Sequence, residues 1–186
     1  MSVKKNINLG DSEKFVAYNT NGVTNCLDLC KMILKNYGIT SYGSSSNIFK
    51  LMYEKNGKLI HYGNDVKDNY KNAINCIDRH LEAGRPIIVG VNHTLNNKIN
   101  EGTTDHFVVI YGRGYDKKLD CYYYNYYEVG KNDIKNGYNN EENRFLFQDD
   151  KYFFDEKSER NDKARFDVTQ VRPNDGDITG TISQND

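Results

Sequence analysis

The chain has 186 residues, enough for one domain with a sizeable core and too few for two full domains. Lysine and arginine number 25, and aspartate and glutamate 26, so the basic excess typical of nucleic-acid binding is absent. No run is apolar enough for a membrane helix, and the N-terminus lacks the apolar region of a secretory signal peptide. We therefore expect no nucleic-acid or membrane partner. The protein is expected to be cytoplasmic in the producing cell, or exported by a route that needs no cleaved signal.

The first half of the chain is predicted to be mainly helical. A helix from about Cys26 to Asn36 places its apolar residues on one face at helical spacing. Residues 44–54 fit a second, shorter helix, and residues 69–83 fit a third that ends at a glycine. The two ends, residues 1–14 and 174–186, are expected to be flexible.

The second half is predicted to be mainly strands. Residues 87–91 form a β-rich apolar run, residues 106–112 and 121–130 indicate a hairpin, and residues 164–171 alternate as a last strand. Helices come first and an antiparallel sheet second, which favours an α+β fold with helices packed against the sheet. We expect residues 1–186 to form this single domain.

The cysteines predict free thiols. Their density is low for a disulfide framework, and their spacing lacks the CxxC pairs typical of structural zinc sites. We therefore expect no metal and no cofactor. The four cysteines are Cys26, Cys30, Cys76 and Cys121.

Cys26 is the candidate nucleophile. With Thr24 or Asn25 as N-cap, it falls in the first turn of the predicted helix, where unpaired N–H groups and the helix dipole favour a thiolate. The alternative is a small buried hydrophobic residue, which is what most free cysteines are. Cys30, one turn further along the apolar face, fits that alternative well.

His106 is the candidate base. It follows a polar loop and opens an apolar strand, a position from which its ring can face a cleft. An imidazolium beside a thiol lowers the thiol pKa and can later protonate a leaving amine. The alternative is an ordinary hydrogen-bonded loop histidine. His93 is a weaker rival, while His61 and His80 look like surface residues.

A third residue is needed to orient the imidazole. If Gly112 pairs with Tyr122, Glu128 lies opposite His106 on the same face of the hairpin. A shifted register presents Asn125 instead, and an amide can also orient an imidazole. We favour Glu128 and keep Asn125 as the alternative.

The oxyanion of an acyl-transfer reaction needs hydrogen-bond donors close to the nucleophile. The backbone N–H of Cys26 is one candidate. Three asparagines at or just before the helix start are candidates for a side-chain donor: Asn19, Asn21 and Asn25.

Three segments form one pattern: residues 25–29, residues 105–112 and the tyrosine-rich run 122–130. This pattern resembles the papain-like cysteine peptidase and amidase superfamily and its compact bacterial branches. In that family a cysteine opens a helix, a histidine opens a strand, and an acid or amide on the next strand completes the set. The resemblance covers roughly residues 15–130 and implies a papain-like fold. Two features depart from the family: no glutamine donor precedes the nucleophile, and Leu27 replaces a common glycine.

Together these features predict a cysteine hydrolase of amide bonds. The resemblance implies a peptide or a peptidoglycan peptide as substrate, and an immunity or inhibitor protein as partner if the protein is an effector toxin. Two other functions are compatible with the same residues. One is a papain-like protein that binds without catalysis, as the missing glutamine would allow. The other is an acyl transferase that uses the same cysteine and histidine.

Overall fold

The computed structural model describes residues 3–42, 47–92, 104–148, 152–155 and 166–176. In these described residues, ten strands form two antiparallel sheets. The large sheet contains β1 (Ile7–Asn8), β2 (Phe49–Lys50), β5 (Ile87–Asn92), β6 (His106–Asp116), β7 (Cys121–Tyr127), β8 (Arg144–Gln148), β9 (Tyr152–Asp155) and β10 (Asp167–Arg172). The small sheet contains β3 (Met52–Lys55) and β4 (Lys58–His61).

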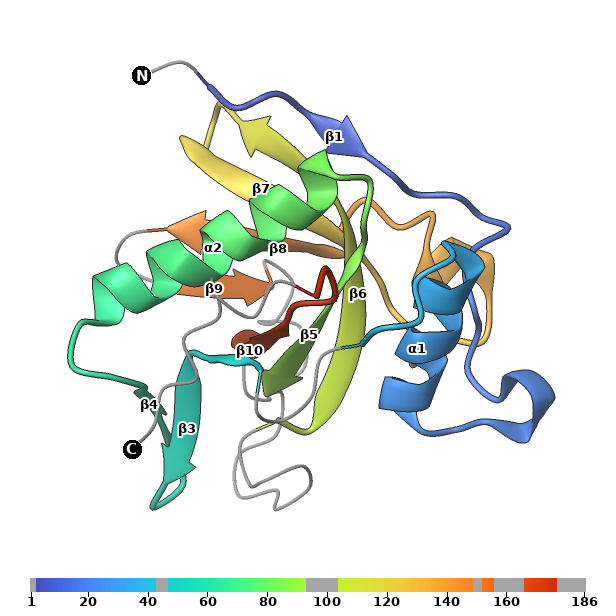
Figure 1. Ribbon diagram of the computed structural model, residues 1–186, viewed down its shortest axis with the longest axis horizontal. Helices are drawn as coiled ribbons and strands as arrows, with labels where there is room; N and C mark the ends of the chain where they lie inside the picture. Colours follow the sequence, from blue (N-terminus) through green and yellow to red (C-terminus); the bar gives the residue numbers. More distant parts are fainter. Residues whose placement is uncertain (1–2, 43–46, 93–103, 149–151, 156–165, 177–186) are drawn as a thin grey trace.

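The large sheet curls into a half-barrel (Figure 1). Its strand order is β1–β6–β5–β10–β9–β8–β7, and β2 pairs with β10. Strand β7, the last in this order, also pairs with β6, the second, so the sheet curls back on itself. The C-terminal strand β10 lies between β5 and β9, deep within the sheet.

The described residues contain three α-helices: α1 (Cys26–Asn36), α2 (Val66–Glu82) and the single turn α3 (Ile134–Gly137). Helices α1 and α2 lie on opposite sides of β6 (Figure 1). Side chains alternate along a strand, so Val108 and Ile110 of β6 pack with the α2 side. Phe107 and Val109 pack with the α1 side. No helix in the described part of the chain is long and apolar enough to cross a bilayer.

The expected α+β papain-like architecture is wrong. The described structure is mostly antiparallel sheet, curled into a half-barrel and accompanied by few helices. Strand β1 precedes the first helix. Strands β2, β3 and β4 precede α2, and β5 follows it directly. The expected layers, with N-terminal helices packed against a C-terminal sheet, are therefore not found.

One cause of this error is the segment 44–54, whose described part is not helical but forms β2 and β3. Asn56 and Gly57 both have positive φ angles, 52° and 72°, which is the backbone of a two-residue hairpin turn. This turn joins β3 to β4 and places Tyr53 opposite Ile60. The apolar spacing of the segment also fits a helix, and the turn decides between the two.

Several elements lie close to their predicted ranges. Helix α1 spans Cys26–Asn36 as predicted, and α2 begins a few residues before the predicted residue 69. The hairpin of β6 and β7 is present. In the N-terminal segment that was expected to be flexible, β1 pairs with β6 through Ile7 and Arg113. The segment expected to be flexible at the other end is described only as far as residue 176.

His80 is a second correction, because it is completely buried rather than on the surface. Its Nδ1 lies 2.8 Å from the backbone oxygen of Cys76. Its Nε2 accepts a hydrogen bond from the backbone N–H of Asn174 at 2.9 Å. The segment after β10 therefore covers the C-terminal end of α2, a contact between residues 94 positions apart.

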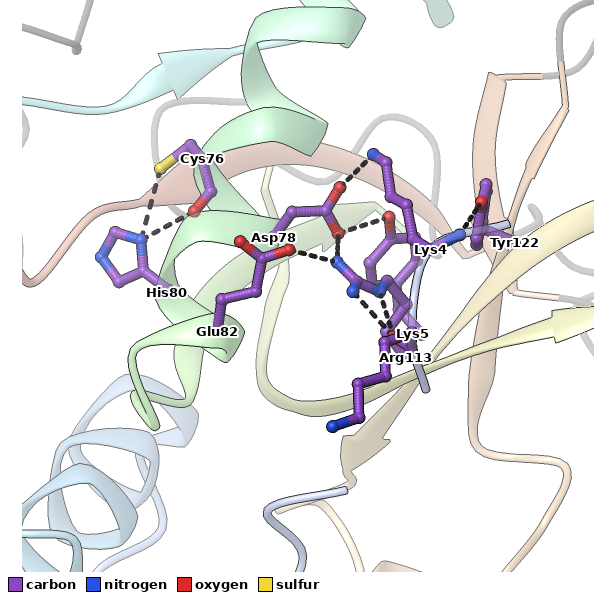
Figure 2. A network of polar contacts seen from close by, with 9 residues as sticks. Lys4, Lys5, Cys76, Asp78, His80, Glu82, Arg113 and Tyr122 are labelled. Atoms are coloured by element: carbon purple, nitrogen blue, oxygen red, sulfur yellow. Dashed lines mark hydrogen bonds and ion pairs between the residues drawn. The ribbon is translucent and has the colours of Figure 1, made fainter. Parts of the chain in front are cut away.

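A polar network joins α2 to the sheet and to the N-terminal segment (Figure 2). Asp78 of α2 accepts hydrogen bonds from Arg113 Nη1 at 2.8 Å and from the Tyr124 hydroxyl at 3.0 Å. Lys4 Nζ lies 2.5 Å from the other Asp78 oxygen, and Arg113 donates to the backbone oxygen of Lys5 at 2.7 Å. Every group in this network has a partner, so we interpret it as structural.

Candidate functional site

Cys26 is the first residue of α1, so its sulfur lies at the positive end of the helix dipole. Asn25 is the N-cap, with an extended backbone and a side-chain oxygen that accepts from the backbone N–H of Asp28 at 3.2 Å. The backbone N–H groups of Leu27 and Phe107 both donate to the Cys26 sulfur, and the His106 side chain is hydrogen-bonded to it. The thiol is half-buried.

His106 is the first residue of β6 and lies opposite Val91 of β5. Its Nε2 is 2.5 Å from Glu128 Oε1, which leaves Nδ1 for the Cys26 sulfur. Only 13% of the His106 side chain and 8% of the Glu128 side chain are exposed, so the pair is shielded from water. The structure thus brings Cys26, His106 and Glu128 together in one chain of contacts.

Glu128 is fixed by the turn that follows β7. Its backbone N–H donates to the backbone oxygen of Gly137 in α3 at 2.8 Å. Its Oε1 also accepts from the backbone N–H of Gly130 at 2.8 Å. A Cβ at position 130 would lie 3.0 Å from this oxygen and 3.5 Å from His106 Cε1. Any larger residue at position 130 would therefore crowd the carboxylate.

These contacts change the pKa of each of the three groups. Burial alone would raise the Cys26 pKa, but the hydrogen bond and charge of His106, with two backbone N–H groups, outweigh burial and lower it. Burial would lower the His106 pKa, but the Glu128 charge and the bonds to Cys26 and Glu128 raise it to about 10. Burial would raise the Glu128 pKa, yet His106 and the Gly130 N–H lower it. The site therefore favours a thiolate beside an imidazolium.

The register from which Glu128 was predicted is wrong. Gly112 lies opposite Asn125 rather than Tyr122, and the pairing shifts at a bulge between Ile110 and Gly112. Glu128 instead lies just beyond the end of β7, from where its side chain reaches the histidine. Asn125, the alternative, lies opposite Gly112, six residues along β6 from His106, which is roughly 20 Å of extended strand.

The three asparagines proposed as oxyanion donors are all exposed. Asn19 and Asn21 belong to the turn around the 3-10 helix η1 (Thr20–Gly22), and both have a left-handed backbone. Asn25 adjoins Cys26, and since its side-chain oxygen caps the helix, its amide nitrogen is the end that can donate. The backbone N–H of Cys26 lies in the first helical turn, whose donors have no partner within the helix.

The other cysteines have different surroundings. All four are free thiols, and Cys30, Cys76 and Cys121 are buried. Burial raises the pKa of Cys30 well above its ordinary value and that of Cys76 to about 12. No group of three or more His, Cys, Asp or Glu side chains within the described ranges is arranged to hold a metal ion. His93, the weaker rival of His106, lies outside the described residues.

Sequence reasoning missed several groups around Cys26. The N–H of Phe107 points to the sulfur only because β6 begins beside α1, and Gly130 matters only because the chain turns back after β7. A glycine two residues after an acid was visible in the sequence, but its partner was not. Polar residues of β10 also lie on the α1 face, and no local pattern predicted them.

A search of protein-family models, curated proteins and solved structures finds no match for this chain. A function must therefore be assigned from the site itself. Its geometry supplies a thiol with a lowered pKa, an imidazole in contact with it, and a carboxylate that fixes the imidazole. These are the parts that nucleophilic catalysis by a thiol requires.

Proposed function

We propose that the protein is a cysteine hydrolase of amide bonds in which Cys26 is the nucleophile, His106 transfers protons and Glu128 orients the ring. The observation that carries this proposal is the contact series from Cys26 to His106 to Glu128, with Nε2 of His106 only 2.5 Å from the carboxylate. An inert buried cysteine needs neither a base nor a carboxylate behind it. This geometry supports a thiol mechanism although the fold is not papain-like.

In the first half-reaction, the Cys26 thiolate attacks the amide carbonyl carbon and a carbon–sulfur bond forms. The imidazolium of His106 gives its proton to the amide nitrogen, the carbon–nitrogen bond breaks, and the amine leaves. The backbone N–H of Cys26 and the side-chain amide of Asn25 are the nearest candidates to stabilise the oxyanion. The product of this step is a thioester on Cys26.

In the second half-reaction, neutral His106 takes a proton from water, and the resulting hydroxide attacks the thioester carbon. The carbon–sulfur bond breaks, the acid product leaves, and the thiolate and imidazolium are restored. Glu128 stays ionised throughout, since its charge stabilises the imidazolium without becoming protonated. We propose a peptide or a peptidoglycan peptide as the substrate that supplies the amide.

The first experiment measures thiol reactivity. Iodoacetamide at pH 6, followed by peptide mass spectrometry, should label Cys26 selectively, because thiols with an ordinary or raised pKa are protonated there. The Cys121→Ala variant serves as a matched control and should leave labelling of Cys26 unchanged. Equal and slow labelling of all four cysteines would contradict an activated nucleophile.

The second experiment measures turnover on a panel of peptides and peptidoglycan fragments. Cys26→Ala should abolish release of amine while leaving the melting temperature within a few degrees of the wild type. Activity that survives this substitution would overturn the assignment of the nucleophile. Addition of a primary amine to the wild-type reaction distinguishes hydrolysis from acyl transfer, because a transferase would form the new amide in preference to the acid.

A further inference from the structure

A second polar array lies on the α1 face of the sheet, built mainly from β10. Thr104 and Thr169 share a hydrogen bond between their hydroxyls at 2.7 Å, and Gln170 Nε2 donates to Thr104 Oγ1 at 2.7 Å. Gln170 Oε1 then accepts from Arg172 Nε at 2.9 Å. Thr104, Thr169 and Gln170 are at most 6% exposed, whereas Arg172 is half-buried. This series of hydrogen bonds thus joins three buried polar side chains to the half-buried Arg172.

The sheet makes room for this array. A Cβ on Gly90 would lie 2.6 Å from Gln170 Cγ and 2.6 Å from Thr104 Cγ2, so β5 carries no side chain at that point. Burying hydrogen-bonded polar groups brings little net stability compared with apolar residues of the same volume. The core therefore gains little stability from this array, whose main effect is to fix the side chain of Arg172 through Gln170.

The position of Arg172 links it to the nucleophile. Its guanidinium carbon lies 4.8 Å from the centre of the Phe107 ring. Phe107 follows His106 directly, and its backbone N–H donates to the Cys26 sulfur. The positive charge of Arg172 is also felt by Cys30, one helical turn beyond Cys26. Phe107 therefore contacts the Arg172 guanidinium with its ring and the Cys26 sulfur with its backbone N–H. Charges within about 10 Å of each other still interact at 0.1 M salt.

We propose that Arg172 binds a carboxylate of the substrate, so that the preferred amide has an acidic group close to the bond that is cleaved. A guanidinium is the side chain best matched to a carboxylate, because its planar fork can form two parallel hydrogen bonds. The hydrogen bond from Arg172 Nε to Gln170 fixes the plane of the guanidinium, and the Phe107 ring packs against the face of this plane. The carboxylate can belong to an acidic side chain or to the C-terminus of a peptide. This inference rests on the proposed hydrolase function.

Two small alkylating reagents test the charge without a known substrate. Iodoacetate and iodoacetamide react with the same thiolate but differ by one negative charge. We expect the ratio of their rates at Cys26 to fall at least threefold in Arg172→Gln and to be largely retained in Arg172→Lys. Arg144→Gln is the matched control, because Arg144 lies on β8 over the Tyr123 ring and is bonded to Asp116. An unchanged ratio in Arg172→Gln, or an equal fall in Arg144→Gln, would overturn the inference.

Gln170→Met provides a second variant that keeps the charge and removes the acceptor for Nε. Its rate ratio should lie between those of the wild type and Arg172→Gln, and a wild-type ratio would show that the array does not fix the guanidinium. Near-ultraviolet circular dichroism of each variant checks that the fold is retained. Should neither reagent label wild-type Cys26 at pH 6, the proposed hydrolase function fails. Should both label it with a ratio independent of Arg172, only the carboxylate site fails.

Paired peptides then separate the two sources of carboxylate. One pair has glutamate or glutamine next to the cleaved bond, and the other has a free or an amidated C-terminus. The wild type should have a higher kcat/KM for the acidic member of one pair, and Arg172→Gln should lose that preference. Equal preference in wild type and Arg172→Gln, in both pairs, would contradict the assignment.

Discussion

At the scale of single residues, the reactivity of Cys26 depends on neighbours from two other segments. His106 contributes both a hydrogen bond and a positive charge that lower the thiol pKa against the effect of burial. Replacement by glutamine keeps a polar side chain but removes the charge. We expect His106→Gln to slow iodoacetamide labelling of Cys26 at pH 6 at least tenfold, because each unit of pKa changes the thiolate fraction tenfold.

The same variant should shift the midpoint of the labelling pH profile upward, towards or beyond the ordinary thiol value of 9.0. His61→Gln is a suitable control, since His61 contacts Tyr70 and Tyr152 in another part of the fold. If both variants keep the wild-type profile, the lowered pKa comes from the helix start and the backbone N–H groups alone.

In the proposed mechanism, Glu128 acts on Cys26 through its contact with His106. Glu128→Gln can still accept from Gly130 and contact the ring, but it removes the negative charge that is the main cause of the raised His106 pKa. We expect the basic limb of the activity profile to move to lower pH and kcat to fall by about 10²–10³, with a smaller change in KM. Glu82→Gln, which changes an exposed acid, should leave the profile unchanged. A fall in kcat with no change in the pH profile would indicate a structural role for Glu128.

At the scale of elements, Asp78 ties α2 to the sheet. It accepts hydrogen bonds from Arg113 and Tyr124 and pairs with Lys4, while its own side chain is only 7% exposed (Figure 2). Asp78→Ala leaves a buried guanidinium without its main partner. We expect the free energy of unfolding to fall by about 3–5 kcal/mol, measured by urea denaturation.

Glu82 is the matched control for this prediction, because it contacts the same Arg113 nitrogen at 3.2 Å from an exposed position. Glu82→Ala should cost less than about 1 kcal/mol, as exposed ion pairs do. Equal losses in the two variants would mean that burial of Asp78 does not determine the strength of the network.

Elements defined by a local pattern could be predicted from the sequence, and those defined by a turn or a bulge were not. Helix α1 has a cap, a periodic apolar face and a glycine after its end, and each of these signals is local. The Asn56-Gly57 pair marks the hairpin turn in the sequence, but the apolar residues of the segment 44–54 also fit helical spacing. The register of β6 and β7 depends on a bulge that the sequence does not mark.

At the scale of the whole molecule, the sheet assembles the candidate site from segments far apart in the chain. Cys26 and His106 could be predicted as site residues because each begins its own helix or strand. Their pairing was predicted from the chemistry of a thiol and an imidazole, because no local pattern links them. The half-barrel could not be predicted, because it depends on β10 entering between β5 and β9 and on β7 returning to β6. The same path brings Arg172 of β10 to the ring of Phe107, which follows His106, and this is why no motif near Cys26 points to Arg172.

The contacts of His106 with Cys26 and Glu128 should also affect the free energy of unfolding. The pKa of His106 rises from 6.5 in the unfolded chain to about 10 in the folded one, so the folded state binds more protons between these values. The contribution of His106 to stability is therefore fully present below pH 6.5 and is lost as the pH rises through about 10. We expect His106→Gln to be less stable than the wild type by a few kcal/mol at pH 6, roughly 2–4, and by much less at pH 10. Urea denaturation at the two pH values measures both differences. A difference that does not depend on pH would show that His106 contributes by packing and hydrogen bonding rather than by its charge.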